Sequence, residues 1–425
     1  MHQLITPANS ISGAIQLPGD KSISHRYGML ASLAEGTSVI HNYSSGADCR
    51  STLECMRALG VAVDINGDVK IEGRGLDGLR EPAAALDCGN SGSTIRMLSG
   101  ILAAQRFSTR IGGDESLSRR PMERIMRPLE QMGARVEARD GRYPPLTIRG
   151  GELHPIEYTL PVPSAQVKSC VLLAGLFAEG TTVVNEPVKT RDHTELALQE
   201  FGAELERRRG TISLTGRPIL KARELVVPGD LSSAAFFLVA AQVVPEGDLT
   251  IRGVGLNPTR STLLDFLIGM GVEVRVLDVQ QTGGELIGDL RVLHSRVRGG
   301  RIDGALAASL IDELPVLAVL GAVSEEGLVV ADASELRVKE TDRISTVADN
   351  LRRMGVAIET RDDGFTVPGR QRFHAARIDS FGDHRIAMAF SIAALAADAP
   401  CEIDNADAAS VSFPEFFDTL QRIAA

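Results

Sequence analysis

A short pattern recurs through this chain at intervals of roughly 70 residues. In each copy an apolar helical stretch ends at a glycine, and a strand of alternating apolar and polar residues follows. Glycine at that position permits the left-handed turn that ends a helix, and alternation with period two is typical of a half-buried strand. The pattern restricts the chain to a fold assembled from copies of one small α/β unit. Its five glycines are Gly60, Gly133, Gly202, Gly271 and Gly355.

A turn and a second strand follow these strands. The turns are Asn66-Gly67, Asp140-Gly141, Arg209-Gly210 and Asp363-Gly364, three of which are favoured hairpin dipeptides. Each unit therefore reads strand, helix, strand, helix, strand, strand (βαβαββ). Six such units would fill the 425 residues, but only five complete closures are present before the chain ends. We therefore predict that the sixth unit takes strands from the N-terminal segment Leu4–Leu17.

This arrangement makes one of two predicted domains discontinuous. Residues 1–18 and 229–425 form one domain with three repeats, and residues 19–228 form the other with three. The crossovers fall at Leu17-Pro18-Gly19-Asp20 and Val227-Pro228-Gly229-Asp230, which are nearly the same sequence. We interpret them as paired hinges near 18–20 and 228–230. The alternative is two unrelated turns, because Pro-Gly-Asp is common turn chemistry.

Composition excludes several classes of protein. The 45 Lys and Arg against 55 Asp and Glu give a net charge of −10, which argues against nucleic acid as a partner. No apolar run reaches the roughly 18 residues needed to cross a bilayer, and no signal-peptide pattern opens the chain, so we expect a cytoplasmic protein without a membrane partner. The five cysteines show no C-x-x-C spacing, which indicates reduced thiols rather than disulfides or a zinc site.

Six polar openings marked by Gly or Pro precede apolar helical stretches. A helix N-terminus presents free backbone N–H groups, and together with hydroxyl and cationic side chains these bind phosphate or carboxylate. In the first opening Lys21, Ser22 and Arg26 would converge in this way, although Asp20 or Ser22 could be only an N-cap. The pattern predicts a small, highly anionic ligand. The openings are Leu17–Arg26, Gly89–Leu98, Pro163–Lys168, Pro228–Ser233, Asp312–Pro315 and Gly382–Ile386.

Eight strings, in their order and spacing, resemble the EPSP synthase (3-phosphoshikimate 1-carboxyvinyltransferase) family of enolpyruvyl transferases over nearly the whole chain. They are LPGDKSISHR at 17–26, GNSGSTIR at 89–96, RPM at 120–122, PSAQVKS at 163–169, RDHTE at 191–195, DELP at 312–315, RVKETDR at 337–343 and DHRIAMAF at 383–390. The resemblance implies a two-domain inside-out α/β barrel with three βαβαββ units per domain, helices inside and sheets outside.

The resemblance also implies an activity. The enolpyruvyl group of phosphoenolpyruvate would pass to the 5-hydroxyl of shikimate 3-phosphate by addition and elimination of phosphate, in the shikimate pathway to chorismate and the aromatic amino acids. No cofactor or metal is implied, and the histidines have no metal-ligand spacing. We expect a monomer that acts on these two small molecules, with glyphosate, a mimic of phosphoenolpyruvate, as an inhibitor.

The resemblance places substrate-binding residues at matching positions of this sequence. Each substrate carries a phosphate and a carboxylate, which require several cations in a partly dry site. Of the cations in the eight strings, Arg96 and Lys168 are the first candidates for purely structural ion pairs. Shikimate 3-phosphate is assigned to Lys21, Ser22, Arg26, Ser164, Gln166, Arg191, Asp312 and Lys339, and phosphoenolpyruvate to Lys21, Gly92, Arg120, Gln166, Arg343 and Arg385.

The reaction requires one acid or base at each reacting centre. We assign Asp312 to the 5-hydroxyl and Glu340 to the C3 carbon of the enolpyruvyl group, with Lys21 assisting proton transfer. Either carboxylate could instead be a helix cap or the partner of an arginine. His384 could orient substrate or only satisfy a local hydrogen bond.

The sequence departs from the family pattern at two positions. No lysine precedes Phe413-Pro414, and Met97 stands where many relatives have proline. The degree of glyphosate sensitivity therefore stays open, although Gly92 favours a sensitive pocket.

Three other functions fit the sequence less well. A UDP-N-acetylglucosamine enolpyruvyl transferase would carry a reactive cysteine in the loop at 111–121, which has none. A P-loop kinase or NTPase requires G-x-x-x-x-G-K-[ST], but here Asp20 stands between Gly19 and Lys21, and no upstream glycine has the right spacing. A non-catalytic phosphate-binding paralogue would be expected to lose Asp312 and Glu340, and both are present.

Overall fold

The computed structural model describes all 425 residues and divides into two compact units. Unit 1 consists of Met1–Pro18, Pro228–Gln280 and Leu286–Ala425, and unit 2 consists of Gly19–Val227 and Gln281–Glu285. The short return of the chain into unit 2 at Gln281–Glu285 was not predicted. There, the Tyr27 hydroxyl donates to the Gly283 carbonyl oxygen at 3.2 Å, and Nδ1 of His193 lies 2.7 Å from Glu285 Oε1.

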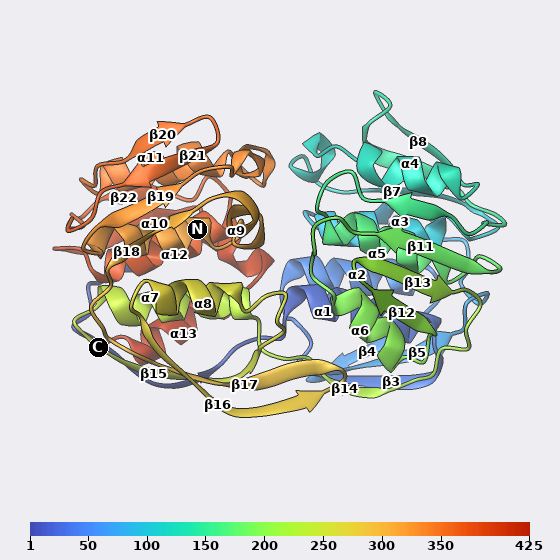
Figure 1. Ribbon diagram of the computed structural model, residues 1–425, viewed down its shortest axis with the longest axis horizontal. Coiled ribbons are helices and arrows are strands. Elements are labelled where there is room, and N and C mark those ends of the chain that lie inside the picture. The colour runs from blue at the N-terminus through green and yellow to red at the C-terminus, as the bar shows by residue number, and fades with distance from the viewer. The chain divides into compact units, whose positions relative to one another are not determined.

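Unit 2 contains three four-stranded sheets and six α-helices (Figure 1). The sheets have the strand orders β14-β3-β5-β4, β6-β7-β9-β8 and β10-β11-β13-β12. Their strands are β3 (Glu35–His41), β4 (Ala62–Asn66), β5 (Asp68–Arg74), β6 (Leu86–Asp87), β7 (Ser108–Gly112), β8 (Arg135–Arg139), β9 (Tyr143–Arg149), β10 (Glu157–Thr159), β11 (Thr181–Asn185), β12 (Leu205–Arg208), β13 (Thr211–Thr215) and β14 (Glu224–Val226). The helices are α1 (Lys21–Leu33), α2 (Ala47–Ala58), α3 (Gly92–Leu102), α4 (Glu123–Gln131), α5 (Ala165–Gly175) and α6 (His193–Glu200), with a short 3₁₀ helix η1 (Leu117–Arg119).

Unit 1 contains two four-stranded sheets, one three-stranded sheet and seven α-helices. The strand orders are β16-β17-β15-β2, β18-β19-β21-β20 and β1-β23-β22. The strands are β1 (Gln3–Ile5), β2 (Ser10–Gln16), β15 (Glu246–Gly255), β16 (Glu273–Thr282), β17 (Glu285–Leu293), β18 (Gly299–Ile302), β19 (Gly327–Val330), β20 (Glu359–Arg361), β21 (Gly364–Val367), β22 (Arg377–Asp379) and β23 (Cys401–Asp404). The helices are α7 (Leu231–Val243), α8 (Thr262–Gly269), α9 (Gly304–Ser309), α10 (Leu314–Val323), α11 (Arg343–Arg353), α12 (His384–Leu395) and α13 (Phe416–Ile423), with 3₁₀ helices η2 (Ser334–Val338) and η3 (Ala406–Val411).

The predicted βαβαββ repeat is confirmed by the strand pairing. In β6-β7-β9-β8, for example, β6 pairs in parallel with β7, and the hairpin β8–β9 completes the sheet in antiparallel pairing. The five glycines that end helices have positive φ angles between 79° and 108°, as the left-handed turn requires. Local turn chemistry therefore sets the repeat.

The leading strands of two repeats are exchanged between the units. β2 precedes α1 in sequence but pairs in parallel with β15 of unit 1, whereas β14 precedes α7 and pairs in parallel with β3 of unit 2. The prediction that Leu4–Leu17 completes the sixth repeat is right for β1, which pairs with β23. It is wrong for β2, which belongs to the fourth sheet because parallel pairing with β15 extends over seven residue pairs.

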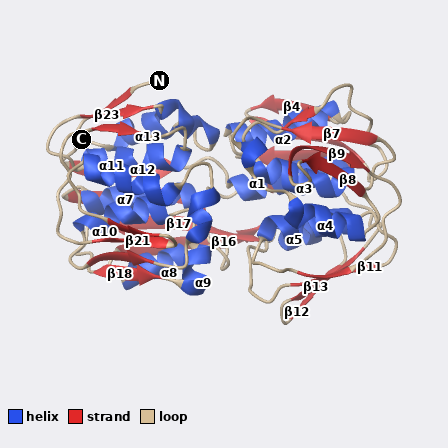
Figure 2. Cartoon of the chain, turned by 90° about the horizontal axis from the view of Figure 1, so that it is seen from above, coloured by secondary structure: helices blue, strands red, loops and turns tan.

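Three helices of each unit are buried along most of their length, and the sheets lie around them (Figure 2). They are α1, α3 and α5 in unit 2 and α7, α10 and α12 in unit 1, and they begin at the six openings named above. Side chains cap five of these six starts, since Asp20, Ser91, Ser164, Asp230 and Asp383 each accept a backbone N–H of the first turn. α10 begins instead with Pro315 in its first turn, where the missing N–H has no cost.

Each unit has its own apolar core, formed by these helices and the inner faces of its sheets. All five cysteines are buried free thiols. None of the helices combines the length and apolar character that crossing a bilayer would require.

Candidate active site

The start of α1 carries the first group of predicted site residues, in unit 2. The Asp20 carboxylate accepts the Ile23 N–H at 2.9 Å, which fixes the first turn of the helix. The Lys21 ammonium lies 2.9 Å from Oδ2 of Asp48, in the first turn of α2, and its side chain is 22% exposed. Lys21 is therefore both oriented by a carboxylate and accessible.

Arg26 is 4% exposed and is held by neutral oxygen atoms. Its guanidinium donates to Thr194 Oγ1 at 2.6 Å, to Ser169 Oγ at 2.7 Å and to the Ser22 carbonyl oxygen at 2.8 Å. Burial lowers the pKa of Arg26 to about 10, against the opposing influence of nearby Glu195. Arg191 also acts on that pKa as a neighbouring cation, so the predicted site residues Ser22, Arg26 and Arg191 lie in one neighbourhood.

The start of α3 has no space for a side chain at its first residue, Gly92. Ser91 caps the helix, and Gly92 is its first residue. A Cβ atom built on Gly92 would lie 2.9 Å from Nη1 of Arg96 and 3.3 Å from Nη1 of Arg120. Two guanidinium groups therefore lie against the bare backbone of this turn. Together with the backbone N–H groups of the turn, they can bind an anion.

Polar side chains connect α3 to α5 and to the loop that carries Arg120. Nη1 of Arg96 donates to Gln166 Oε1 at 2.8 Å, and Gln166 Nε2 donates to Ser93 Oγ at 2.9 Å. Arg120 donates to Asn90 Oδ1 at 2.8 Å and to Ser116 Oγ at 3.2 Å. Ser164, the remaining predicted residue of this unit, caps α5 with an Oγ that accepts the Val167 N–H at 3.4 Å.

Lys168 has a structural role, one of the two alternatives that the sequence left open for it. The side chain is 1% exposed, and its ammonium lies 2.5 Å from Glu186 and 2.7 Å from Glu195. Burial raises the pKa of Glu195 even though Lys168 acts in the opposite direction. The two carboxylates and the ammonium thus form a buried cluster below the start of α5.

Unit 1 brings the other predicted residues together around Arg343, the first residue of α11. Arg343 is 1% exposed, and its Nε donates to Asp383 Oδ2 at 2.8 Å. Its Nη2 lies 2.5 Å from Glu340 Oε2, and its Nη1 lies 3.7 Å from Asp312 Oδ1. Three carboxylates therefore surround one buried guanidinium.

Asp312 also joins Lys339 and Arg385. The Lys339 ammonium lies 3.3 Å from Asp312 Oδ1, and Nη1 of Arg385 donates to the Asp312 carbonyl oxygen at 2.8 Å. The side chains of Lys339 and Asp312 are 28% and 19% exposed, so both can meet solvent or ligand. All five predicted residues of this unit meet at the starts of α10, α11 and α12.

Electrostatics fix the charge state at the centre of this cluster. Burial would raise the pKa of Asp383, but the Arg343 guanidinium outweighs it and holds that pKa below its ordinary value. Burial would likewise lower the pKa of Arg343, yet Asp383 and Glu340 raise it above its ordinary value. Both groups are therefore charged near neutral pH.

Comparison with known proteins now decides the family. The chain matches the family model described as EPSP synthase (3-phosphoshikimate 1-carboxyvinyltransferase) over residues 5–420. The chain belongs to the EPSP synthase family. A curated 3-phosphoshikimate 1-carboxyvinyltransferase of Solibacter usitatus is 66% identical over 425 residues, covering 100% of both chains. One of Koribacter versatilis is 55% identical over 99% of this chain and 98% of its own.

Solved structures agree with the assignment. The EPSP synthase of Acinetobacter baumannii is 42% identical and superposes with a TM-score of 0.89, covering 100% of this chain and 98% of that chain. The enolpyruvyl transferase NikO of Streptomyces tendae is 20% identical, with a TM-score of 0.80 over 99% of this chain and 96% of that chain, which shows a shared fold. The inside-out α/β architecture expected for the EPSP synthase family is thereby confirmed.

Sequence reasoning from the EPSP synthase motifs missed the residues that hold the cations in place. Asp48 orients Lys21, Asn90 binds Arg120, and Asp383 binds Arg343. Asn90 and Asp383 lie inside quoted strings, at or beside a helix start, and could have been proposed from that position. Asp48 lies in no string, and only the folded chain brings it to Lys21.

A surface cavity of about 410 Å³ lies beside the loop before α3, lined among others by Gly89, Arg110, Asp114 and Ser118. None of the predicted site residues of the EPSP synthase family lines it.

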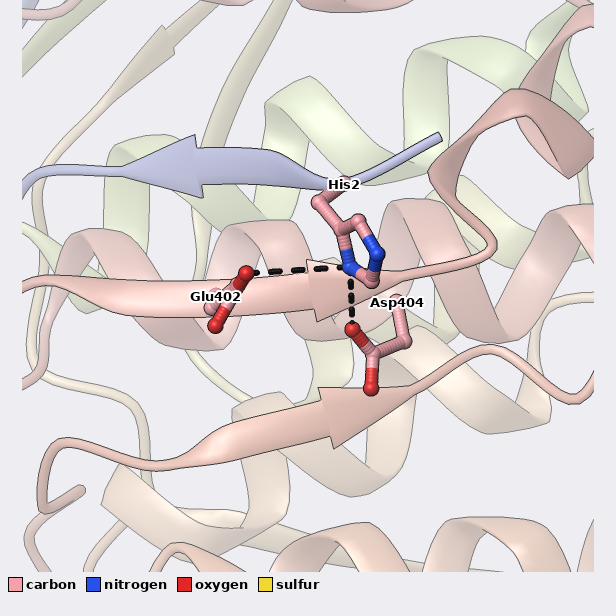
Figure 3. A group of neighbouring side chains, drawn as sticks. All are labelled: His2, Glu402 and Asp404. Carbon is pink, nitrogen blue, oxygen red and sulfur yellow. Dashed lines mark hydrogen bonds and ion pairs between the residues drawn. The ribbon is translucent and has the colours of Figure 1, made fainter.

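One group of side chains has the composition of a metal site. His2, Glu402 and Asp404 place possible ligand atoms within 4.8 Å of one another, at the N-terminal strand β1 and at β23 (Figure 3). Asp404 is already paired with Arg377 at 2.6 Å, and its other oxygen accepts from His2. Hydrogen bonding from Arg377 holds the pKa of Asp404 below its ordinary value. We interpret the group as surface ion pairs that fasten β1.

Proposed function

We propose that this protein transfers the enolpyruvyl group of phosphoenolpyruvate to the 5-hydroxyl of shikimate 3-phosphate, with release of phosphate. One observation carries the proposal. At the starts of α1 and α3 the guanidinium groups of Arg26, Arg96 and Arg120 donate to neutral oxygens, and the starts of α10, α11 and α12 gather cations with carboxylates. The first arrangement suits anion binding, and the second also supplies groups that accept and donate protons.

Shikimate 3-phosphate is assigned to the α1 side of unit 2 and to two residues of unit 1. Arg26 and Arg191 would face its phosphate with the hydroxyls of Ser22 and Ser164, since guanidinium groups bind phosphate in a fixed geometry. The remaining contacts are assigned to Lys21, Gln166, Asp312 and Lys339.

Phosphoenolpyruvate is assigned to the start of α3. The missing side chain of Gly92 lets an anion reach the backbone N–H groups between the guanidinium groups of Arg96 and Arg120. Further contacts to phosphoenolpyruvate are assigned to Lys21, Gln166, Arg343 and Arg385. Arg96 adds to the residues proposed from the sequence, because it contacts the same turn.

The proton transfers are assigned to two carboxylates. As the 5-hydroxyl oxygen attacks C2 of phosphoenolpyruvate, its proton passes to Asp312, and Glu340 in its acid form protonates C3 to give a methyl group. In the tetrahedral adduct the C2–O bond to phosphate then breaks, and the methyl proton returns to Glu340 as the C2–C3 double bond re-forms. Lys21 assists these transfers and offsets charge on the departing phosphate.

Phosphate release tests the activity. We expect turnover with both substrates together, none with either alone, and none when UDP-N-acetylglucosamine replaces shikimate 3-phosphate. The variant Asp312→Asn keeps the carbonyl oxygen that accepts from Arg385 and should lower kcat by about 10²–10⁴-fold. Asp349→Asn on the exposed face of α11 is the control and should leave kcat unchanged. Turnover by wild type with UDP-N-acetylglucosamine, or full activity of Asp312→Asn, would overturn the assignment.

Inhibition by glyphosate follows from the proposed phosphoenolpyruvate site. A methyl group added in Gly92→Ala would displace the Arg96 guanidinium from 2.9 Å and crowd the turn. We expect competitive inhibition against phosphoenolpyruvate in wild type, and weaker inhibition in the variant. Equal inhibition constants for the two proteins would argue against this turn as the binding site.

The two chain crossings at Pro18–Gly19 and Val227–Pro228 are proposed as hinges, and the protein is proposed to act as a monomer. Pro18 and Pro228 fix their φ angles and lack an N–H. The Asp230 N–H donates to the Pro18 carbonyl oxygen at 3.1 Å, so the two crossings are neighbours. Small-angle scattering should give the mass of one chain and a smaller radius of gyration with shikimate 3-phosphate and glyphosate. An unchanged radius would contradict the hinges.

A further inference from the structure

A chain of buried hydroxyl and imidazole groups links three helices of unit 2. Nδ1 of His25 on α1 lies 2.7 Å from Oγ1 of Thr52 on α2, and that hydroxyl lies 2.7 Å from Oγ1 of Thr94 on α3. Thr94 in turn donates to Oγ of Ser91, the N-cap of α3, at 2.7 Å. All four side chains are fully buried.

The direction of the hydrogen bonds follows from counting protons. A hydroxyl has one proton, so if Thr94 donates to Ser91, Thr52 must donate to Thr94, and His25 must donate to Thr52 through Nδ1–H. Burial, with Lys21 and Arg26 nearby, holds the pKa of His25 well below its ordinary value, so the ring is neutral. Nε2 then carries no proton, and it has no hydrogen-bond partner in the buried interior. Each link therefore has one donor and one acceptor.

The two ends of this hydrogen-bonded chain, His25 and Ser91, lie beside residues assigned to different substrates. His25 directly precedes Arg26 on α1, and Ser91 directly precedes Gly92 at the start of α3. Thr52 is one turn from Asp48, the partner of Lys21, and the Asp48 carbonyl oxygen lies 3.4 Å from Thr94 Oγ1. The chain thus fixes the spacing between one helix start and the other.

We propose that the chain His25–Thr52–Thr94–Ser91 is a positioning element that sets the start of α1 against the start of α3, so that binding of shikimate 3-phosphate and of phosphoenolpyruvate strengthen each other. The inference rests on the proposed function. When one ligand orders its helix start, a rigid connection also orders the other helix start. The second ligand then loses less conformational entropy on binding. A polar network that only fills the core would change stability without changing this coupling.

The variant Thr52→Val tests the proposal because it keeps the shape of the side chain and removes the central hydroxyl. Initial rates over a grid of both substrate concentrations give the factor by which one substrate alters the affinity for the other. We expect Thr52→Val to lower this factor at least about fivefold, within the usual range of coupling energies. Thr52→Ser keeps a hydroxyl and should restore most of it.

A matched control is Ser32→Ala on α1, which removes a fully buried hydroxyl bonded only to the Gly28 carbonyl oxygen. It should leave the coupling factor unchanged while thermal melting reports any loss of stability in all variants. An unchanged factor in Thr52→Val, an equal fall in Ser32→Ala, or a wild-type factor of one would overturn the proposal. Thr94→Val serves as a second break in the chain if Thr52→Val fails to fold. Absence of any turnover in wild type would instead refute the proposed function, so the two failures are distinguishable.

Discussion

Arg26 of unit 2 and Arg343 of unit 1 are both almost fully buried, yet their surroundings differ in kind. Two hydroxyls and a carbonyl oxygen hold Arg26, whereas carboxylates of Asp383, Glu340 and Asp312 surround Arg343. Burial lowers the pKa of Arg26 to about 10, while the carboxylates hold the pKa of Arg343 above its ordinary value despite burial. The same side chain is therefore prepared for different tasks.

The contrast separates anion binding from proton transfer. A guanidinium held by neutral oxygens keeps its full charge, so an incoming phosphate supplies the missing counter-charge. A guanidinium already surrounded by carboxylates attracts another anion less strongly, but it holds those carboxylates in place for acid and base chemistry. Lys168 of unit 2 shows the limiting case, since two carboxylates bind its ammonium in the interior.

The largest effect should come from breaking the ion pairs around Arg343. Asp383→Asn keeps an oxygen that can cap α12 but removes the charge that Arg343 contacts at 2.8 Å. Breaking a buried pair costs about 3–5 kcal/mol, and we expect about 3 because Glu340 remains. Urea denaturation measures the loss, with Asp362→Asn in an exposed turn as the control. A loss below about 1 kcal/mol would contradict this expectation, because it would show that Glu340 and Asp312 can replace Asp383 as partners of Arg343.

The second effect concerns Arg26 and should appear in binding more than in stability. Arg26→Gln can still bond the hydroxyls of Thr194 and Ser169, but it removes the positive charge. We expect the KM for shikimate 3-phosphate to rise about 100-fold, equivalent to about 2.7 kcal/mol, with a smaller change in the KM for phosphoenolpyruvate. Arg50→Gln, on the exposed side of α2, should change neither constant. A rise confined to phosphoenolpyruvate would reverse the assignment of the two sites.

A smaller, pH-dependent effect should distinguish the two clusters by sign. The pKa of Asp383 is lowered on folding, so its contribution to stability is complete above the unfolded pKa of about 3.9 and is lost as the pH falls through the folded value. The pKa of Glu195 is raised by burial, so its contribution falls as the pH rises from about 4.3 through the folded value.

The measurement is the stability difference between wild type and each variant, Asp383→Asn and Glu195→Gln, from urea midpoints between about pH 3 and 6.5. The difference should grow with pH for Asp383 and shrink with pH for Glu195, each by no more than about 1.4 kcal/mol per pH unit. Glu204→Gln, an exposed position, is the control and should give a flat difference. Slopes of the same sign would mean that Lys168 outweighs burial at Glu195.

Most of the repeat could be predicted because its signals are local. A glycine that ends a helix, a hairpin dipeptide and a capping residue such as Asp20 act within a few residues, and the structure has them where the sequence indicated. The exchange of β2 and β14 could not be predicted in the same way. Both strands precede a Pro-Gly-Asp sequence, and only pairing with distant β15 and β3 decides which sheet each joins.

The candidate site divides along the same line. Its cations stand in motif strings and could be named from them, whereas the groups that hold them come from distant parts of the chain. Arg26 and Thr194 are 168 positions apart, and Arg343 and Asp383 are 40 apart. Whether a given arginine meets hydroxyls or carboxylates depends on helix packing, and this choice determines the contrast between the two units.

The smallest loss of stability should come from removing an ion pair at the surface, where burial no longer strengthens the interaction between the charges. His2, just before β1, and Asp404 of β23 lie 2.5 Å apart at the surface (Figure 3), but solvent screens such pairs and they contribute little. We expect His2→Gln to leave the urea midpoint at pH 6 almost unchanged, and any difference to disappear in about 1 M salt, where the Debye length is about 3 Å. The Asp383→Asn loss should persist at that salt concentration, because its ion pair is buried. If His2→Gln instead lowers the stability and the loss persists in high salt, the attachment of β1 through His2, and not charge burial, would govern the stability of unit 1.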